Sequence, residues 1–132
     1  MWKAQEQVRE FMRGVKGLDL SPTLRIPTRE ERNLCIELMA EELSETEDAM
    51  SLNPPVGELG AQLVDVADGL ADLLYVVLYT CNVYGMDIEP IFDEVQRSNM
   101  TKKGGPKSST GKQLKPTTYS PPDLTPILQQ ML

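Results

Sequence analysis

Histidine is absent from the 132 residues of this chain, and that absence excludes more than any other feature of the composition. Without imidazole, no Ser-His-Asp or Cys-His catalytic unit can form, and neither can a zinc or di-iron site that uses histidine. Cysteine is scarce too, since the chain has only Cys35 and Cys81, which form no CxxC pair and lie inside apolar runs. This placement is typical of buried free thiols rather than of a disulfide framework.

Positive charge is missing from the middle of the chain. Residues 33–96 contain no Lys or Arg but fourteen Asp and Glu, whereas residues 97–115 contain six basic side chains and no acidic one. The net charge of −7 argues against a nucleic-acid-binding protein. An acidic region can bind cations and a basic region can bind phosphates, so together they indicate a phosphate ligand bridged by a metal ion.

Long apolar runs are also missing. The start of the chain has no apolar signal-peptide core, and the longest uncharged run within a helical pattern, residues 73–86, is too short to cross a bilayer. We therefore expect a cytoplasmic protein that does not contact membranes.

Strand-like alternation is absent, and helical periodicity predicts an all-α fold, a four-helix bundle in a single domain of residues 1–132. The expected helices cover about residues 1–15, 28–50, 56 or 58 to 84, and 87–100. Thr28 and Glu31 form a capping-box pattern at the start of the second helix, and Asn53-Pro54-Pro55 should end it. Gly85 is expected as a left-handed cap of the third helix and Asp87 as the N-cap of the fourth.

Apolar spacing predicts which side chains face inward. In the first, second and fourth helices these are Val8, Phe11, Met12 and Val15; Leu34, Leu38 and Leu43; and Ile91, Phe92 and Val95. The third helix is the most apolar element, so it should be central or shared with a second subunit.

Residues 101–132 differ in character from the bundle of residues 1–100. Gly, Pro, Ser, Thr and Lys dominate as far as residue 125, a composition typical of a mobile basic loop, but Ile127, Leu128, Met131 and Leu132 predict a docking turn at the end. We expect this segment to fold back over the bundle, with its lysines near the acidic helices.

Two sets of carboxylates lie on helix faces without counter-charges: Glu41, Glu42 and Glu45 on the second helix, and Asp65, Asp68 and Asp72 on the third. A single set of this kind would be interpreted as the solvent-exposed face of a helix. Two sets favour a cation site, because like charges repel on a helix and no Lys or Arg is near in sequence. Oxygen donors without His favour Mg²⁺ or Mn²⁺, and no EF-hand loop or P-loop is present.

The sequence EELSE at residues 41–45 resembles the EExxE signature of the MazG-like, all-α nucleoside triphosphate pyrophosphohydrolases. That superfamily includes dCTP pyrophosphatases, dimeric dUTPases and phosphoribosyl-ATP pyrophosphohydrolases. Residues 65–102 and the tail pattern at 111–124 are similar to small bacterial and phage members, so the resemblance covers about residues 29–132. The second motif departs from the usual ExxD, since Gly69 stands three residues before Asp72. Asp68 or Asp65 must therefore substitute for the missing acidic residue of the motif. Tyr79 and Gln96 are two further positions at which the chain departs from the small bacterial and phage members.

The resemblance implies a role for each acidic residue. Glu42, Glu45 and Asp72 would bind Mg²⁺, with Asp68 as the fourth ligand, and Glu41 would orient or deprotonate the attacking water. It further implies attack at the α-phosphorus of a nucleoside triphosphate, release of pyrophosphate, a preference for deoxynucleotides and a homodimer or homotetramer.

Candidate contacts to the substrate lie at the end of the fourth helix and after it: Arg97, Asn99, Lys102, Lys103 and Tyr119. For the lysines, a solvated loop is an equally good interpretation. Two other hypotheses stay open for the whole chain, namely a regulatory protein that binds nucleotide or metal without turnover, and a structural helical oligomerisation domain.

Overall fold

The computed structural model describes residues 1–51 and 59–132, and this described part is all-α, as the sequence predicts. It contains five helices: α1 (Lys3–Gly14), α2 (Arg29–Ser51), α3 (Leu59–Val83), α4 (Ile88–Met100) and α5 (Thr125–Gln129). Extended pairing in the described ranges is limited to one isolated bridge, between Lys107 and Gln113. The predicted stop at Asn53-Pro54-Pro55 and the predicted start at Val56 or Glu58 lie outside the described residues.

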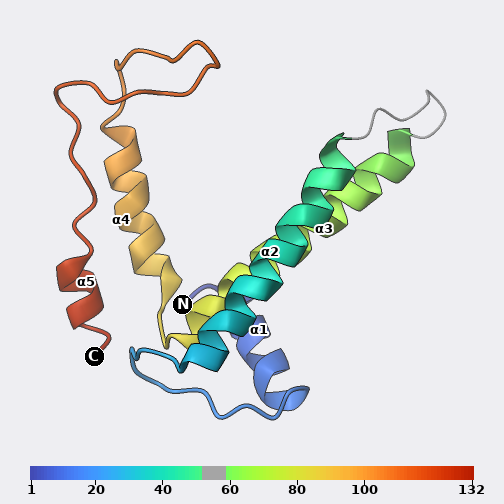
Figure 1. Cartoon of the computed structure of the whole chain (residues 1–132). Helices are drawn as coiled ribbons and strands as arrows, with labels where there is room; N and C mark the ends of the chain where they lie inside the picture. Colours follow the sequence, from blue (N-terminus) through green and yellow to red (C-terminus); the bar gives the residue numbers. More distant parts are fainter. Residues whose placement is uncertain (52–58) are drawn as a thin grey trace.

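The helices α2 and α3 form a long antiparallel hairpin, with α1 packed across one end of it (Figure 1). The capping box at the start of α2 is confirmed, because the Glu31 amide donates to Thr28 Oγ1 and the Thr28 amide donates to the Glu31 carboxylate. The left-handed cap after α3 is confirmed as well, since Gly85 has φ of 69°. A side chain at Gly85 would collide with the Thr23 carbonyl, so only glycine fits there.

The side chains that face inward only partly follow the apolar spacing. Val8, Met12 and Ile91 are buried, as predicted. The prediction that four further side chains face inward was wrong, because these are exposed: Val15, Leu34, Leu43 and Phe92. On α2 the buried positions are Cys35, Thr46 and Ala49. At Thr46 a small side chain is required, because Gly69 of α3 approaches closely there.

A buried polar junction joins α1, the end of α3 and the start of α4. Gln5 is fully buried, and its amide nitrogen donates to Asn82 Oδ1 at 3.0 Å and to the Met86 carbonyl at 2.6 Å. Its amide oxygen accepts from the Ile88 backbone N–H at 3.1 Å. Paired polar groups of this kind fix one arrangement of the elements that they join. This junction therefore sets where α4 leaves the hairpin.

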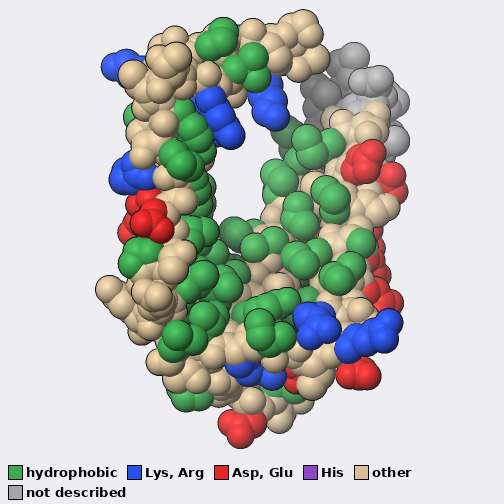
Figure 2. Space-filling view, turned by 60° about the vertical axis from the view of Figure 1, so that its left-hand side comes forward, with side chains coloured by type: hydrophobic (Ala, Val, Ile, Leu, Met, Phe, Trp, Pro, Cys, Tyr) green, Lys and Arg blue, Asp and Glu red, His purple; other side chains and the backbone are tan. Residues whose placement is uncertain are grey.

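From the junction, α4 and residues 101–132 form an arm that stands apart from the hairpin (Figure 1). Asp87 caps α4 as predicted, accepting from the Glu89 amide. The C-terminal segment returns beside α4, and the Met131 carbonyl accepts from the Leu24 amide at 2.9 Å. The C-terminal turn therefore lies against the loop that precedes α2. However, the segment follows α4 rather than the hairpin, and an opening separates arm and hairpin (Figure 2).

None of the helices in residues 1–51 and 59–132 combines the length and apolarity needed to cross a bilayer.

Candidate functional site: an acidic groove beside an aromatic cavity

An open groove of about 350 Å³ lies between α2 and α3, and most of its lining side chains are carboxylates. We call it the acidic groove; it is lined by Glu45, Asp48, Ala49, Asp65, Asp68, Gly69 and Asp72. Three of the four predicted metal ligands thus share one cavity. Asp48 was missed by the sequence analysis, although its position three residues after Glu45 places it on the same helix face.

The fourth predicted ligand, Glu42, has a buried oxygen with no hydrogen-bond partner among the described residues. Burial raises the pKa of this carboxyl, and the neighbouring charges of Glu45, Asp72, Glu41 and Asp68 raise it further. A buried carboxylate oxygen normally has a partner, because desolvating it without one costs free energy. Glu42 is therefore held in an environment that favours either a proton or a cation.

These residues fit a hard divalent cation in their chemistry, since all the donors are carboxylate oxygens and Glu42 Oε2 lacks a protein partner. In residues 1–51 and 59–132, no group of three or more such side chains is close enough to hold a metal ion as it stands. A bound cation would draw these carboxylates together, because it offsets the repulsion between like charges. Glu41 is exposed and does not line the groove.

A second cavity, of about 370 Å³, borders the acidic groove at Asp72. We call it the aromatic cavity; its lining is Phe11, Lys16, Leu38, Glu42, Asp72, Tyr75, Val76 and Tyr79. The Phe11 and Tyr75 rings meet edge to face, with centroids 5.7 Å apart. An apolar cavity with a few polar groups, next to a cluster of acids, is the arrangement expected of a ligand site.

A family model for phosphoribosyl-ATP pyrophosphohydrolase matches residues 8–99 of the chain. The chain belongs to this family. It is therefore a member of the MazG-like, all-α superfamily that the EELSE motif indicated, and the match begins at residue 8 within α1, upstream of the residues that the resemblance covers. No curated protein matches the chain closely enough to be counted as a relative.

The departure from the superfamily's ExxD motif has a structural reason. A Cβ at Gly69 would lie 2.7 Å from Thr46 Oγ1 and 3.2 Å from the Thr46 Cα, so α2 and α3 approach each other closely at these two residues. A glutamate at position 69 would force the helices apart. The acids that can substitute, Asp65 and Asp68, both line the groove, so both stay candidates for the fourth ligand.

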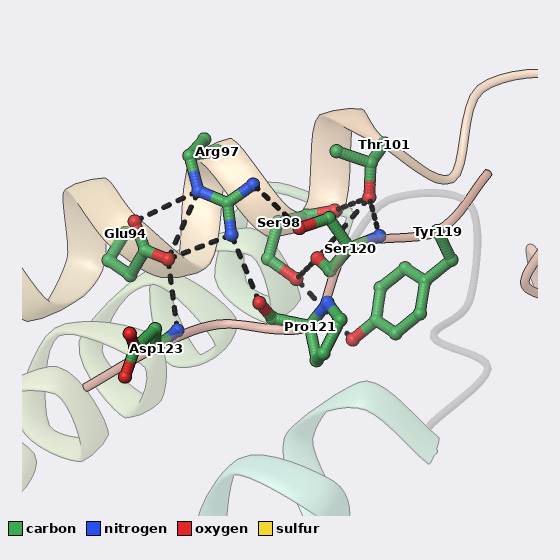
Figure 3. Close-up of polar contacts among 8 residues, drawn as sticks. All are labelled: Glu94, Arg97, Ser98, Thr101, Tyr119, Ser120, Pro121 and Asp123. Carbon is green, nitrogen blue, oxygen red and sulfur yellow. Dashed lines mark hydrogen bonds and ion pairs between the residues drawn. The ribbon is translucent and has the colours of Figure 1, made fainter. Parts of the chain in front are cut away.

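The five candidate substrate contacts lie on the arm, and none of them lines the acidic groove or the aromatic cavity. Arg97 makes a two-pronged contact with Glu94 and also donates to Ser120 Oγ and the Pro121 carbonyl (Figure 3). Tyr119 lies beneath two ammonium groups, with Lys115 Nζ 4.8 Å and Lys102 Nζ 6.0 Å from its ring centroid. Asn99 and Lys103 are exposed. Their role in binding substrate stays a prediction.

Proposed function

We propose that this protein is a Mg²⁺-dependent nucleoside triphosphate pyrophosphohydrolase that converts a (d)NTP and water to a (d)NMP and pyrophosphate. The carrying observation is the acidic groove, in which two helices of a pyrophosphohydrolase family member present carboxylates without counter-charges beside the unpartnered Glu42 oxygen. Deoxynucleotides as preferred substrates, control of the cytoplasmic nucleotide pool as the role, and Mn²⁺ as a substitute for Mg²⁺ complete the proposal.

Each acidic residue has a task in this proposal. Glu42, Glu45 and Asp72, with Asp68 or Asp65, hold the cation between α2 and α3. When bound, Mg²⁺ neutralises charge on the triphosphate and lowers the pKa of a bound water. Glu41 orients the attacking water and takes its proton, the new bond forms at the α-phosphorus, and the bond to the α,β-bridging oxygen breaks, so pyrophosphate leaves.

The test is a product assay over a panel of ribo- and deoxynucleoside triphosphates, with phosphoribosyl-ATP included because the family description names it. We expect equal amounts of monophosphate and pyrophosphate in Mg²⁺, and no release in EDTA. Release of inorganic phosphate instead, or release that is indifferent to EDTA, would contradict the proposal. If phosphoribosyl-ATP is the one compound hydrolysed, the proposed substrate is wrong, but the proposed pyrophosphate-releasing reaction is retained.

One observation favours a second candidate function. Glu41, the proposed base, is exposed and does not line the acidic groove, which is compatible with a regulatory protein that binds nucleotide or metal without turnover. Tight binding of nucleotide in Mg²⁺ without any product would support this alternative.

We also propose a homodimer or homotetramer. Large apolar side chains are exposed on α3 and α4: Leu63, Val64, Leu70, Leu74, Phe92 and Met100. Exposed apolar surface of this extent is typical of an interaction site. Light scattering should give a multiple of 14.7 kDa at micromolar concentration, and a mass near 14.7 kDa would contradict the assembly.

A further inference from the structure

Lys16 brings a positive charge into the cavity that adjoins the acidic groove. It follows α1, in a turn that the left-handed Gly17 (φ 66°) makes possible. Two backbone hydrogen bonds hold this turn, from the Lys16 amide to the Phe11 carbonyl and from the Leu18 amide to the Met12 carbonyl. The backbone position of Lys16 is therefore set by the end of α1 rather than by a free loop.

The Tyr79 side chain holds the ammonium group of Lys16 in place. Lys16 Nζ donates to the Tyr79 hydroxyl at 2.8 Å and lies 4.7 Å from the Tyr79 ring centroid. Tyr79 itself is only 5% exposed, so it offers a rigid support. An ammonium has three N–H donors and no acceptor, and this is its one partner within residues 1–51 and 59–132. Donors thus remain for a ligand in the cavity.

The cavity also has the surfaces that a heterocyclic base requires. The Phe11 and Tyr75 rings and the Leu38 and Val76 side chains form apolar walls, against which a flat ring can stack. Glu42 and Asp72 line the same space, so a ligand here lies directly beside the carboxylates proposed to hold the cation. No sequence pattern predicts this site, because Lys16 belongs to no motif or periodic pattern.

We propose that the aromatic cavity takes the base of a nucleotide whose phosphates lie at the acidic groove, and that Lys16 selects a base with a carbonyl over one with an amino group. A carbonyl oxygen accepts from the ammonium, whereas an exocyclic amino group presents hydrogens to it and offers no acceptor. Lys16 is exposed, so an oxo-base would replace a water molecule on this ammonium. The inference rests on the proposed function and names its substrate class: nucleotides of oxo-bases such as hypoxanthine, guanine, uracil and thymine.

Matched nucleotide pairs isolate this contact, because ITP and ATP, and UTP and CTP, differ mainly in an oxo or amino group at one ring position. We expect kcat/KM to be about tenfold or more higher for ITP and UTP, as for a charge-assisted hydrogen bond. In Lys16→Met the two members of each pair should become nearly equal. Lys3→Met, a surface lysine of α1 that lines neither cavity, is the control and should keep the preference.

Three results would overturn the inference: equal rates within each pair for the wild type, a preference for ATP and CTP, or a uniform loss for all four nucleotides in Lys16→Met. The last would place Lys16 at a phosphate. Calorimetric binding of IMP against AMP gives the same comparison without turnover. If no nucleotide is hydrolysed, the proposed function fails, but tighter binding of IMP that disappears in Lys16→Met would still support the base preference.

Discussion

The α2–α3 hairpin and the arm are held together by opposite means. In the hairpin, small side chains let two helices approach closely at Thr46 and Gly69, and the carboxylates beside this contact have no basic partner in the described residues. In the arm, Glu94 and Arg97 neutralise each other, and hydrogen bonds attach the C-terminal segment to α4 (Figure 3). Paired charges in this molecule maintain structure, and the unpaired ones remain available to a ligand.

The largest effect should come from removing charge in the acidic groove. Glu42→Gln, Glu45→Gln or Asp72→Asn should each lower turnover by orders of magnitude, because an amide binds Mg²⁺ more weakly than a carboxylate. Stability should be unchanged or higher, since repulsion between carboxylates is relieved. Pyrophosphate release and thermal unfolding measure the two effects. Glu47→Gln, an exposed acid of α2 outside the groove, is the control, and activity near wild type in all three groove variants would exclude the assignment.

The next effect concerns the spacing of the two helices. Gly69→Ala places a Cβ against Thr46, and overpacking of this kind costs about 1–3 kcal/mol. Because the groove carboxylates flank this contact, cation affinity should fall as well. Gly60→Ala on the same helix has nothing within 4 Å of its Cβ and should stabilise by about 0.5–1 kcal/mol.

A second substitution sharpens that test. Thr46→Ala removes the Oγ1 atom nearest to the added Cβ, so the double variant should recover part of the lost stability and cation affinity. Equal behaviour of the Gly69 and Gly60 variants would show that the close contact does not set the groove.

A smaller effect is expected from the basic side of the arm. Replacing Lys102 and Lys103 together by Gln should raise KM for the triphosphate and weaken its salt dependence, because screened attraction to phosphate is removed. The rate at saturation should change little. Lys3→Gln serves as the control for a surface lysine elsewhere, and an unchanged KM in the double variant would make residues 102 and 103 an ordinary solvated loop.

The smallest effect is the pH dependence of the arm. Hydrogen bonds from Arg97 and from the Asp123 backbone N–H lower the pKa of Glu94 from 4.5 to about 2. A carboxyl whose pKa is lowered by folding stabilises the folded state above its unfolded pKa, and that contribution disappears as the pH falls from about 4.5 to about 2. Amide hydrogen exchange at Asp123 should therefore accelerate across this window relative to α1, and Glu94→Gln should abolish the change.

The local signals in the sequence were sufficient for the helices, their caps and the carboxylate sets. The Thr28–Glu31 box and the caps at Gly85 and Asp87 depend on neighbouring residues only, and they were predicted correctly. The faces of α2 were not, because a contact made by Thr46 rather than by leucine depends on how closely α3 approaches. Arg97 also shows this limit, since its partners at residues 120 and 121 are distant in sequence.

Measuring Mn²⁺ affinity is the most direct way to compare the hairpin with the arm. The paramagnetic signal of the ion reports its binding, and the measurement requires no substrate. The full chain should bind the ion, Asp72→Asn should weaken binding by at least about tenfold, and the Lys102, Lys103 double variant should bind as the wild type does. Undiminished binding in Asp72→Asn, or no binding by the wild type, would contradict the account that the unpaired carboxylates of α2 and α3 form a cation site.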